Sequence, residues 1–172
     1  MNITRTLYDI GNNGPFFLFF TSFYLLWTKE RLFFYYIIGF FISIILNMLL
    51  KAIVKQPRPS VDSSVFYLLK NSKKIMNIPY DMFGMPSGHT QSCCFSTVFI
   101  FLSLKKYSML FWYLLLTFIT TYQRVKYKFH TTLQVIIGGI VGILLGFIIY
   151  YISQNNIKGN LKLKRDDNNL IK

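Results

Sequence analysis

The chain of 172 residues has the length of a single domain, but it is too apolar for an ordinary water-soluble one. Hydrophobic residues make up 53% and aromatic residues 19% of the sequence, and the mean hydropathy is +0.40. Long stretches without a charged residue exclude intrinsic disorder, collagen and coiled coil. The composition therefore predicts a membrane protein.

The formal net charge of +13 arises from 19 Lys and Arg against 6 Asp and Glu, which fall between the apolar stretches. A basic chain usually suggests nucleic acid, but these residues form no basic face on a soluble helix, so we expect no nucleic-acid partner. Anionic lipid headgroups or a phosphorylated substrate fit the charge better. Cys93 and Cys94 are adjacent within an apolar stretch and cannot make a disulfide framework.

Uncharged apolar runs predict the helices, in chain order, at residues 16–28, 32–50, 90–104, 107–122 and 131–152. Because a helix needs about 20 residues to cross a bilayer, the second and fifth runs are the clearest spans. The first run is short and is tilted, interfacial or helped across the bilayer by snorkelling of Lys29 and Arg31. The third is long enough only if its helix begins near Pro86, a residue suited to a first helical turn.

We therefore predict an all-α, multi-pass transmembrane helical bundle with four to five spans and its active site at one membrane face. Residues 1–152 form the expected membrane-embedded domain, and residues 153–172 form a polar tail. No small-residue cleavage site follows the first run, so no cleaved signal peptide is expected. Basic residues divide almost evenly between the two sides of this topology, so their count does not orient the chain.

Alternating spans bring three polar clusters to one side of the membrane, and the first is Lys51 with Arg58-Pro59. Seven residues are about two helical turns, so both cations can project from one edge of a helix end. Pro57 and Pro59 predict that regular helix stops before Arg58. The alternative is a basic patch that anchors the chain to lipid headgroups.

The second cluster is the run Gly-Met-Pro-Ser-Gly-His-Thr-Gln at residues 84–91. If the third helix begins here, its first backbone N–H groups and the positive end of its dipole face the loop, which favours phosphate oxygens. Gly88 lets the backbone approach an anion closely. The alternative is a simple helix cap at Ser87, with His89 as an interfacial polar residue.

The third cluster contains Arg124, His130 and Gln134. His130 and Gln134 are four residues apart on the predicted fifth helix and so share one face. The Gln134 amide oxygen can then accept a hydrogen bond from one imidazole nitrogen and fix the tautomer of the ring. The same four-residue step continues through glycines at 138, 142 and 146, which predicts close packing of a neighbouring helix.

Together the clusters resemble the signature of the type 2 phosphatidic acid phosphatase superfamily of membrane lipid phosphatases. That signature has Lys, six residues and Arg-Pro; then Pro-Ser-Gly-His; then Ser-Arg, five residues, His, three residues and Asp. The first two motifs are complete at residues 51–59 and 86–89. The third keeps Arg124 and His130 but has Gln123 for the serine and Gln134 for the aspartate. Glutamine at that last position, within the run His-Thr-Thr-Leu-Gln-Val, resembles the dolichyl-diphosphatase branch.

The resemblance implies roles for these residues in hydrolysis of a lipid phosphate. His130 would attack phosphorus and form a phosphohistidine, and His89 would donate a proton to the leaving group. The implied phosphate-binding residues are Lys51, Arg58, Ser87, Gly88 and Arg124. These cations and amides supply the charge stabilisation, so no cofactor and no metal are expected.

The expected substrate is a membrane lipid, either a polyprenyl diphosphate of the dolichyl type or a phospholipid phosphate, and bilayer lipids are the other expected partners. The resemblance places such a protein in the endoplasmic reticulum membrane of a eukaryote or otherwise in the plasma membrane; the oligomeric state stays open. The main alternative is a catalytically inactive lipid-binding or scaffold protein of the same fold. A channel or transporter is disfavoured because no charged residue lies within a predicted span.

Overall fold

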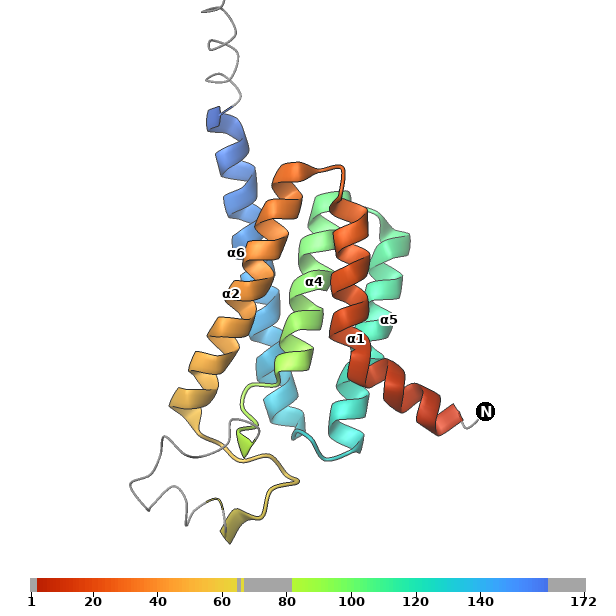
Figure 1. Cartoon of the computed structure of the whole chain (residues 1–172), viewed down its shortest axis with the longest axis vertical. Helices are drawn as coiled ribbons and strands as arrows, with labels where there is room; N and C mark the ends of the chain where they lie inside the picture. The colour runs from red at the N-terminus through yellow and green to blue at the C-terminus, as the bar shows by residue number, and fades with distance from the viewer. Residues whose placement is uncertain (1–2, 65, 67–81, 161–172) are drawn as a thin grey trace, which may run out of the picture.

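The computed structural model describes residues 3–64, 66 and 82–160, which form a bundle of long helices (Figure 1). The helices are α1 (Ile3–Leu26), α2 (Glu30–Val54), α4 (Gly88–Leu104), α5 (Tyr107–Lys126) and α6 (Thr132–Asn160). These described residues contain no β-strand, although Pro57 and Phe83 form an isolated antiparallel bridge after α2. The predicted all-α class is therefore confirmed.

Helix α4 lies at the centre of the bundle and contacts each of the other four helices. Its aromatic side chains Phe95 and Phe99 are fully buried and pack against the ring of Tyr36 from α2. The Tyr36 hydroxyl is also satisfied, because it lies 2.9 Å from Ser96 Oγ. On the other side of α4, the glycines of α6 allow close approach: a Cβ at Gly142 would overlap the backbone of α4. The predicted small-residue packing face is thus confirmed.

The runs 32–50, 90–104, 107–122 and 131–152 correspond to α2, α4, α5 and α6. Two segments, Glu30–Val54 and Thr132–Asn155, are long and apolar enough to cross a membrane, in agreement with the two clearest predicted spans. Helix α2 ends before Arg58, as the prolines predict. Helix α6 continues through Asn160, beyond the predicted start of the polar tail at residue 153; residues 161–172 lie outside the described part of the chain.

The first helix differs most from its prediction, because α1 begins at Ile3 instead of near residue 16. Its polar stretch Gly-Asn-Asn-Gly-Pro, residues 11–15, has low helix propensity. Here Gly11 and Gly14 lie directly against side chains of α5. Tertiary contact therefore maintains a helical segment that local propensity does not predict.

Candidate active site

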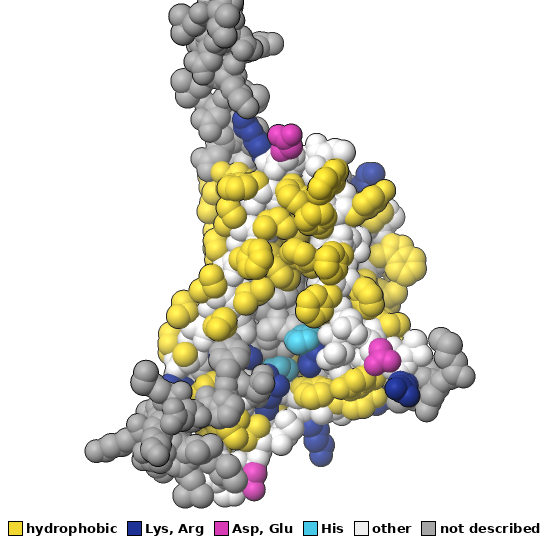
Figure 2. Space-filling model, viewed as in Figure 1, with side chains coloured by type: hydrophobic (Ala, Val, Ile, Leu, Met, Phe, Trp, Pro, Cys, Tyr) yellow, Lys and Arg dark blue, Asp and Glu magenta, His cyan; other side chains and the backbone are white. Residues whose placement is uncertain are grey.

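The residues singled out in the sequence meet at one end of the bundle, where α2 and α5 end and α4 and α6 begin (Figure 1). Lys51 lies in the last turn of α2 and Arg124 in the last turn of α5. Ser87 is the N-cap residue of α4. His130 and Gln134 lie just before α6 and in its first turn. Figure 2 shows both histidines in a hollow near this end, beside basic side chains.

His130 and Gln134 form the predicted contact, although His130 precedes the helix instead of belonging to it. The distance from His130 Nδ1 to Gln134 Oε1 is 3.2 Å. The Gln134 amide nitrogen donates to Gln56 Oε1 at 3.1 Å and to the Pro57 carbonyl at 3.0 Å. Because a carbonyl only accepts, these contacts turn the amide oxygen toward the imidazole. His130 therefore carries its proton on Nδ1, and Nε2 keeps the lone pair.

The surroundings of His130 favour the neutral imidazole. The side chain is only 3% exposed. Burial, followed by the charges of Arg58 and Lys51, lowers the pKa of His130 to about 4, although hydrogen bonds to Gln134 and the Gly84 backbone oppose the shift. At neutral pH the ring is uncharged, which is the protonation state that a nucleophile needs.

Three cations surround the two imidazoles. Lys51 and Arg58 act electrostatically on His130, and Arg58 and Arg124 act on His89. Arg58 Nε donates to the Phe83 carbonyl at 3.2 Å, which ties the segment after α2 to the residues that lead into α4. The described residues contain no group of three or more His, Cys, Asp or Glu that could hold a metal ion. The charge near the histidines is therefore positive and suits an anion.

The Pro-Ser-Gly-His turn is held by helices on two sides. The Ser87 backbone N–H donates to the Gln134 carbonyl at 3.0 Å, which joins the turn to α6. Asn47 Nδ2 donates to the Pro86 carbonyl at 3.2 Å and to Gln91 Oε1 at 2.9 Å, which joins it to α2. The Ser87 hydroxyl makes no cap bond and lies 3.2 Å from Thr90 Oγ1. The simple-cap alternative therefore does not describe this serine.

Helix α1 supplies contacts that the sequence prediction missed. Arg124 Nη2 donates to Asn12 Oδ1 at 2.8 Å, and the His89 imidazole hydrogen-bonds the backbone of Asn12. Gln56 was also missed, although it holds the Gln134 amide. Asn12 lies outside the three motifs and Gln56 occupies an unspecified position between Lys51 and Arg58 of the first motif. Each acts on a partner far away in the sequence. Only the packing of the helices brings them to the site.

An apolar groove opens beside His89 and is lined by α1, α2 and the start of α4. Its volume is about 430 Å³. Five of its twelve lining residues are phenylalanines, and Gly88, His89 and Asn47 also line it. The other lining residues are Pro15, Phe16, Phe19, Phe20, Phe40, Phe41, Ile44, Met48 and Ser92. The site therefore joins a cationic, polar part to an aromatic one.

The structure brings every candidate residue of the three motifs into this one cluster. The candidates are Lys51, Arg58, Ser87, Gly88, His89, Arg124, His130 and Gln134. The buried imidazole of His130, with its fixed tautomer, the half-buried imidazole of His89 and three cations form an arrangement that can bind a phosphoryl group and transfer it to nitrogen.

Comparison with known proteins agrees with this geometry. A family model described as the PAP2 superfamily matches residues 32–158, which is well over half of the chain. The match contains all three motifs and begins after α1. No curated protein and no solved structure matches the chain. On the strength of the family match and the three motifs it spans, the chain belongs to the PAP2 superfamily.

Proposed function

We propose that the chain is an integral-membrane lipid phosphatase that works through a phosphohistidine intermediate. Members of the PAP2 superfamily are phosphatases that act on phosphate esters, often those of lipids. The observation that carries the proposal is the cluster of His130 and His89 with three cations at one end of the bundle. Nucleophile, proton donor and charge stabilisation are thus present in one place.

In the proposed first step, the Nε2 lone pair of His130 attacks phosphorus. The N–P bond forms while the bond from phosphorus to the leaving oxygen breaks. His89, which takes up a proton when the anionic phosphate binds and offsets the nearby cations, transfers that proton to the leaving oxygen. In the second step, neutral His89 takes a proton from water as the water oxygen attacks phosphorus. The N–P bond then breaks, inorganic phosphate leaves, and both histidines return to their starting states.

The three cations stabilise the charge that develops on the phosphoryl oxygens. Lys51, Arg58 and Arg124 together carry three positive charges, and a guanidinium binds two oxygens of one phosphate at once. The mechanism needs no metal, because fixed cations and backbone N–H groups provide the electrostatic stabilisation. The His130 ring becomes positively charged when Nε2 bonds to phosphorus. The ring delocalises this charge onto Nδ1, whose N–H donates to Gln134.

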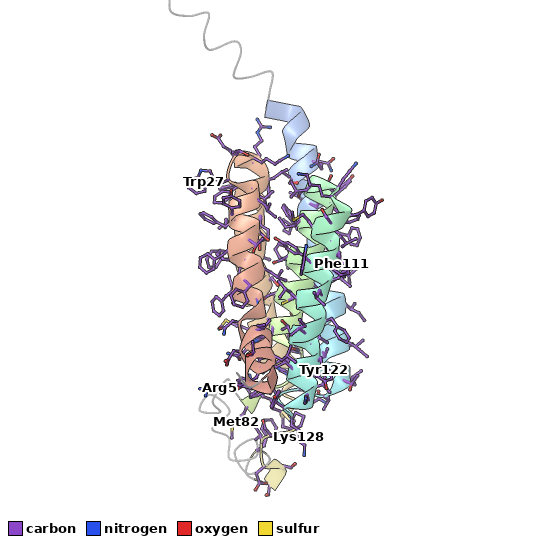
Figure 3. All side chains as sticks on the ribbon, turned by 90° about the vertical axis from the view of Figure 1, so that its right-hand side faces the viewer. Arg5, Trp27, Met82, Phe111, Tyr122 and Lys128 are labelled. Carbon is purple, nitrogen blue, oxygen red and sulfur yellow. The ribbon has the colours of Figure 1, made fainter. Side chains whose placement is uncertain are left out.

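Surface chemistry supports a lipid environment for the bundle. Phe20 of α1, Phe118 of α5 and Phe147 of α6 are 65%, 67% and 50% exposed, respectively. Figure 2 shows hydrophobic side chains over the middle of the bundle and charged ones near its two ends. In Figure 3, Trp27 lies at the end opposite Met82 and Lys128 and points outward. Apolar exposure of this extent suits several membrane-spanning helices, with the site at one face.

The aromatic groove supports a substrate with a long apolar chain. Its lining includes His89, so a phosphate bound at the cations would place the first carbons of the lipid against Phe16, Phe19 and neighbouring rings. The glutamine at position 134 favours a polyprenyl diphosphate of the dolichyl type within the lipid phosphates. We propose this class as the substrate.

Phosphate release from the detergent-solubilised protein tests the proposal. The panel contains a dolichyl diphosphate, a shorter isoprenyl diphosphate, dolichyl monophosphate and phosphatidate at equal detergent mole fraction. We expect the fastest turnover with the diphosphates, no turnover by His130→Ala, and a phosphohistidine that is trapped only with His130 present. Equal rates on all lipids would overturn the polyprenyl assignment, and an inactive wild-type protein would favour the lipid-binding or scaffold alternative.

A further inference from the structure

The bent segment of α1 at residues 11–15 lies against the candidate site but outside the family match, which begins at residue 32. Pro15 lies inside the helix and has no backbone N–H, so it cannot donate to the carbonyl of Gly11. Proline at such a position kinks a helix. Figure 1 shows the N-terminal part of α1 turning away from the direction of the rest of the helix.

Two glycines let this segment approach α5 closely. A Cβ at Gly11 would lie 2.6 Å from Gln123 Cβ, and a Cβ at Gly14 would overlap the Thr120 hydroxyl. Gly11 and Gly14 are both buried. Residue 12 stands between them, so the close packing sets the distance from Asn12 to the end of α5.

Asn12 contacts two candidate active-site residues by two different groups. Its side-chain oxygen accepts from Arg124 Nη2 at 2.8 Å, and its main-chain carbonyl accepts from the His89 imidazole. The adjacent Asn13 does neither, because its side chain is exposed and donates to the Asp9 carbonyl at 2.9 Å. The two asparagines have identical side chains, but that of Asn12 contacts the candidate site and that of Asn13 is exposed.

The Arg124 guanidinium depends on Asn12 for its orientation. Arg124 is 5% exposed, and within the described residues its Nε has no hydrogen-bond partner. The guanidinium carbon lies 5.0 Å from the centre of the Phe129 ring, a contact that leaves the fork free to rotate in the ring plane. A hydrogen bond from Nη2 to Asn12 removes that freedom.

We propose that Asn12 is a positioning residue of the phosphatase site: its side chain aligns Arg124 with the phosphoryl group and its carbonyl orients His89. The inference rests on the proposed function. It also implies that α1, which precedes the matched region, is a working part of this site. Asn12 reaches the reacting phosphate only through Arg124 and His89.

The test is a double-mutant cycle of Asn12→Ala with Arg124→Ala, with Asn13→Ala as the matched control. Because hydrogen bonds to charged groups are worth more than neutral ones, we expect Asn12→Ala to lower turnover by about tenfold or more. Asn13→Ala should keep wild-type turnover. In the Arg124→Ala background, Asn12→Ala should have little further effect, because its partner is already absent. Independent losses that multiply in the double variant would overturn the positioning role.

Orthovanadate binding, measured as the rise in the unfolding temperature of the detergent-solubilised protein, separates this inference from the proposed function. Asn12→Ala should bind vanadate more weakly than Asn13→Ala whether or not the protein turns over a lipid. Unchanged vanadate binding by Asn12→Ala would overturn the inference. A wild-type protein that binds vanadate through Asn12 and Arg124 but releases no phosphate would instead overturn the proposed function.

Two further readouts protect the test against misfolding and against a purely structural role. If Asn12→Ala does not fold, Asn12→Ser keeps a polar group whose hydroxyl is too short to reach Arg124, and the same loss is expected. The His89 contact uses the main chain, so the dependence of the rate on leaving-group quality should match that of the wild type in both variants. A changed dependence would show that the side chain acts through His89 and would contradict the assignment to Arg124.

Discussion

Replacement of Gln134 tests how His130 is prepared for attack. The Gln134 side chain is fully buried and makes four hydrogen bonds, to His130 Nδ1, the Thr131 N–H, Gln56 Oε1 and the Pro57 carbonyl. In Gln134→Ala the imidazole loses its acceptor, so either ring nitrogen can carry the proton and the ring can rotate. We expect turnover to fall roughly 10- to 100-fold, as for other partners that orient a reactive histidine.

The same change should also weaken the fold. At about 1 kcal/mol for each hydrogen bond, with buried acceptors left unpaired, we expect Gln134→Ala to lower the free energy of unfolding by roughly 2–4 kcal/mol. Thermal unfolding followed by circular dichroism measures this loss. Turnover must be compared at a temperature at which both proteins are folded. Leu133→Ala, at an exposed neighbouring position on the same helix, is the control and should change neither quantity appreciably.

Gln134→Glu distinguishes the contribution of the amide oxygen, which accepts from His130, from that of the amide nitrogen, which donates to Gln56 and Pro57. The carboxylate can still accept from His130, but its second oxygen would face Gln56 Oε1 and the Pro57 carbonyl. Gln56 can rotate its amide to donate, whereas the carbonyl cannot, so we expect this isosteric variant to lose activity as well. Gln134→Asp is shorter by one methylene and adds charge beside a phosphate, so it should gain nothing. A fully active Gln134→Ala enzyme would refute the orienting role.

The other expected outcomes follow from the same geometry. His89→Ala should lose less activity on a substrate with a good leaving group, because such a group needs less protonation; equal losses on good and poor leaving groups would contradict the acid role. Phosphate release should survive EDTA, and a complete loss restored by Mg²⁺ would falsify the metal-free mechanism. Arg58→Lys and Arg124→Lys should both be poor enzymes in steady-state assays, since an ammonium keeps the charge but not the planar, two-pronged contact. Because the pKa of His130 falls from 6.5 to about 4, the unfolded chain binds this proton more readily. The wild type should therefore lose up to roughly 3 kcal/mol of stability relative to His130→Gln as pH falls from 6.5 toward 4, measured by unfolding in detergent.

Sequence patterns alone predicted the helical class, because α2, α4, α5 and α6 coincide with uncharged apolar runs. Hydrophobic runs of this length are local properties of the chain, so no tertiary information is needed to find them. The sequence also predicted that three motifs share one end of the bundle, because consecutive helices alternate in direction. The His130 to Gln134 contact was predicted from spacing alone and is present at 3.2 Å, although His130 lies just before the helix. The spacing of residues in the sequence predicts which side chains are neighbours, but it does not predict the residue at which a helix begins.

The tertiary structure decided what holds these motifs in place. Gln134 is fixed by Gln56, 78 residues away in the sequence, and Arg124 by Asn12, 112 residues away. Contacts between residues so far apart produce no periodic pattern in the sequence. Nothing local distinguishes Asn12 from Asn13, because both are asparagines of α1. Only the bend at Pro15 and the glycine contacts with α5 place Asn12, and not Asn13, beside the site. Local pattern thus identified the candidate residues of the site, while long-range packing determined their orientation, because hydrogen-bond geometry depends on where helices meet in space.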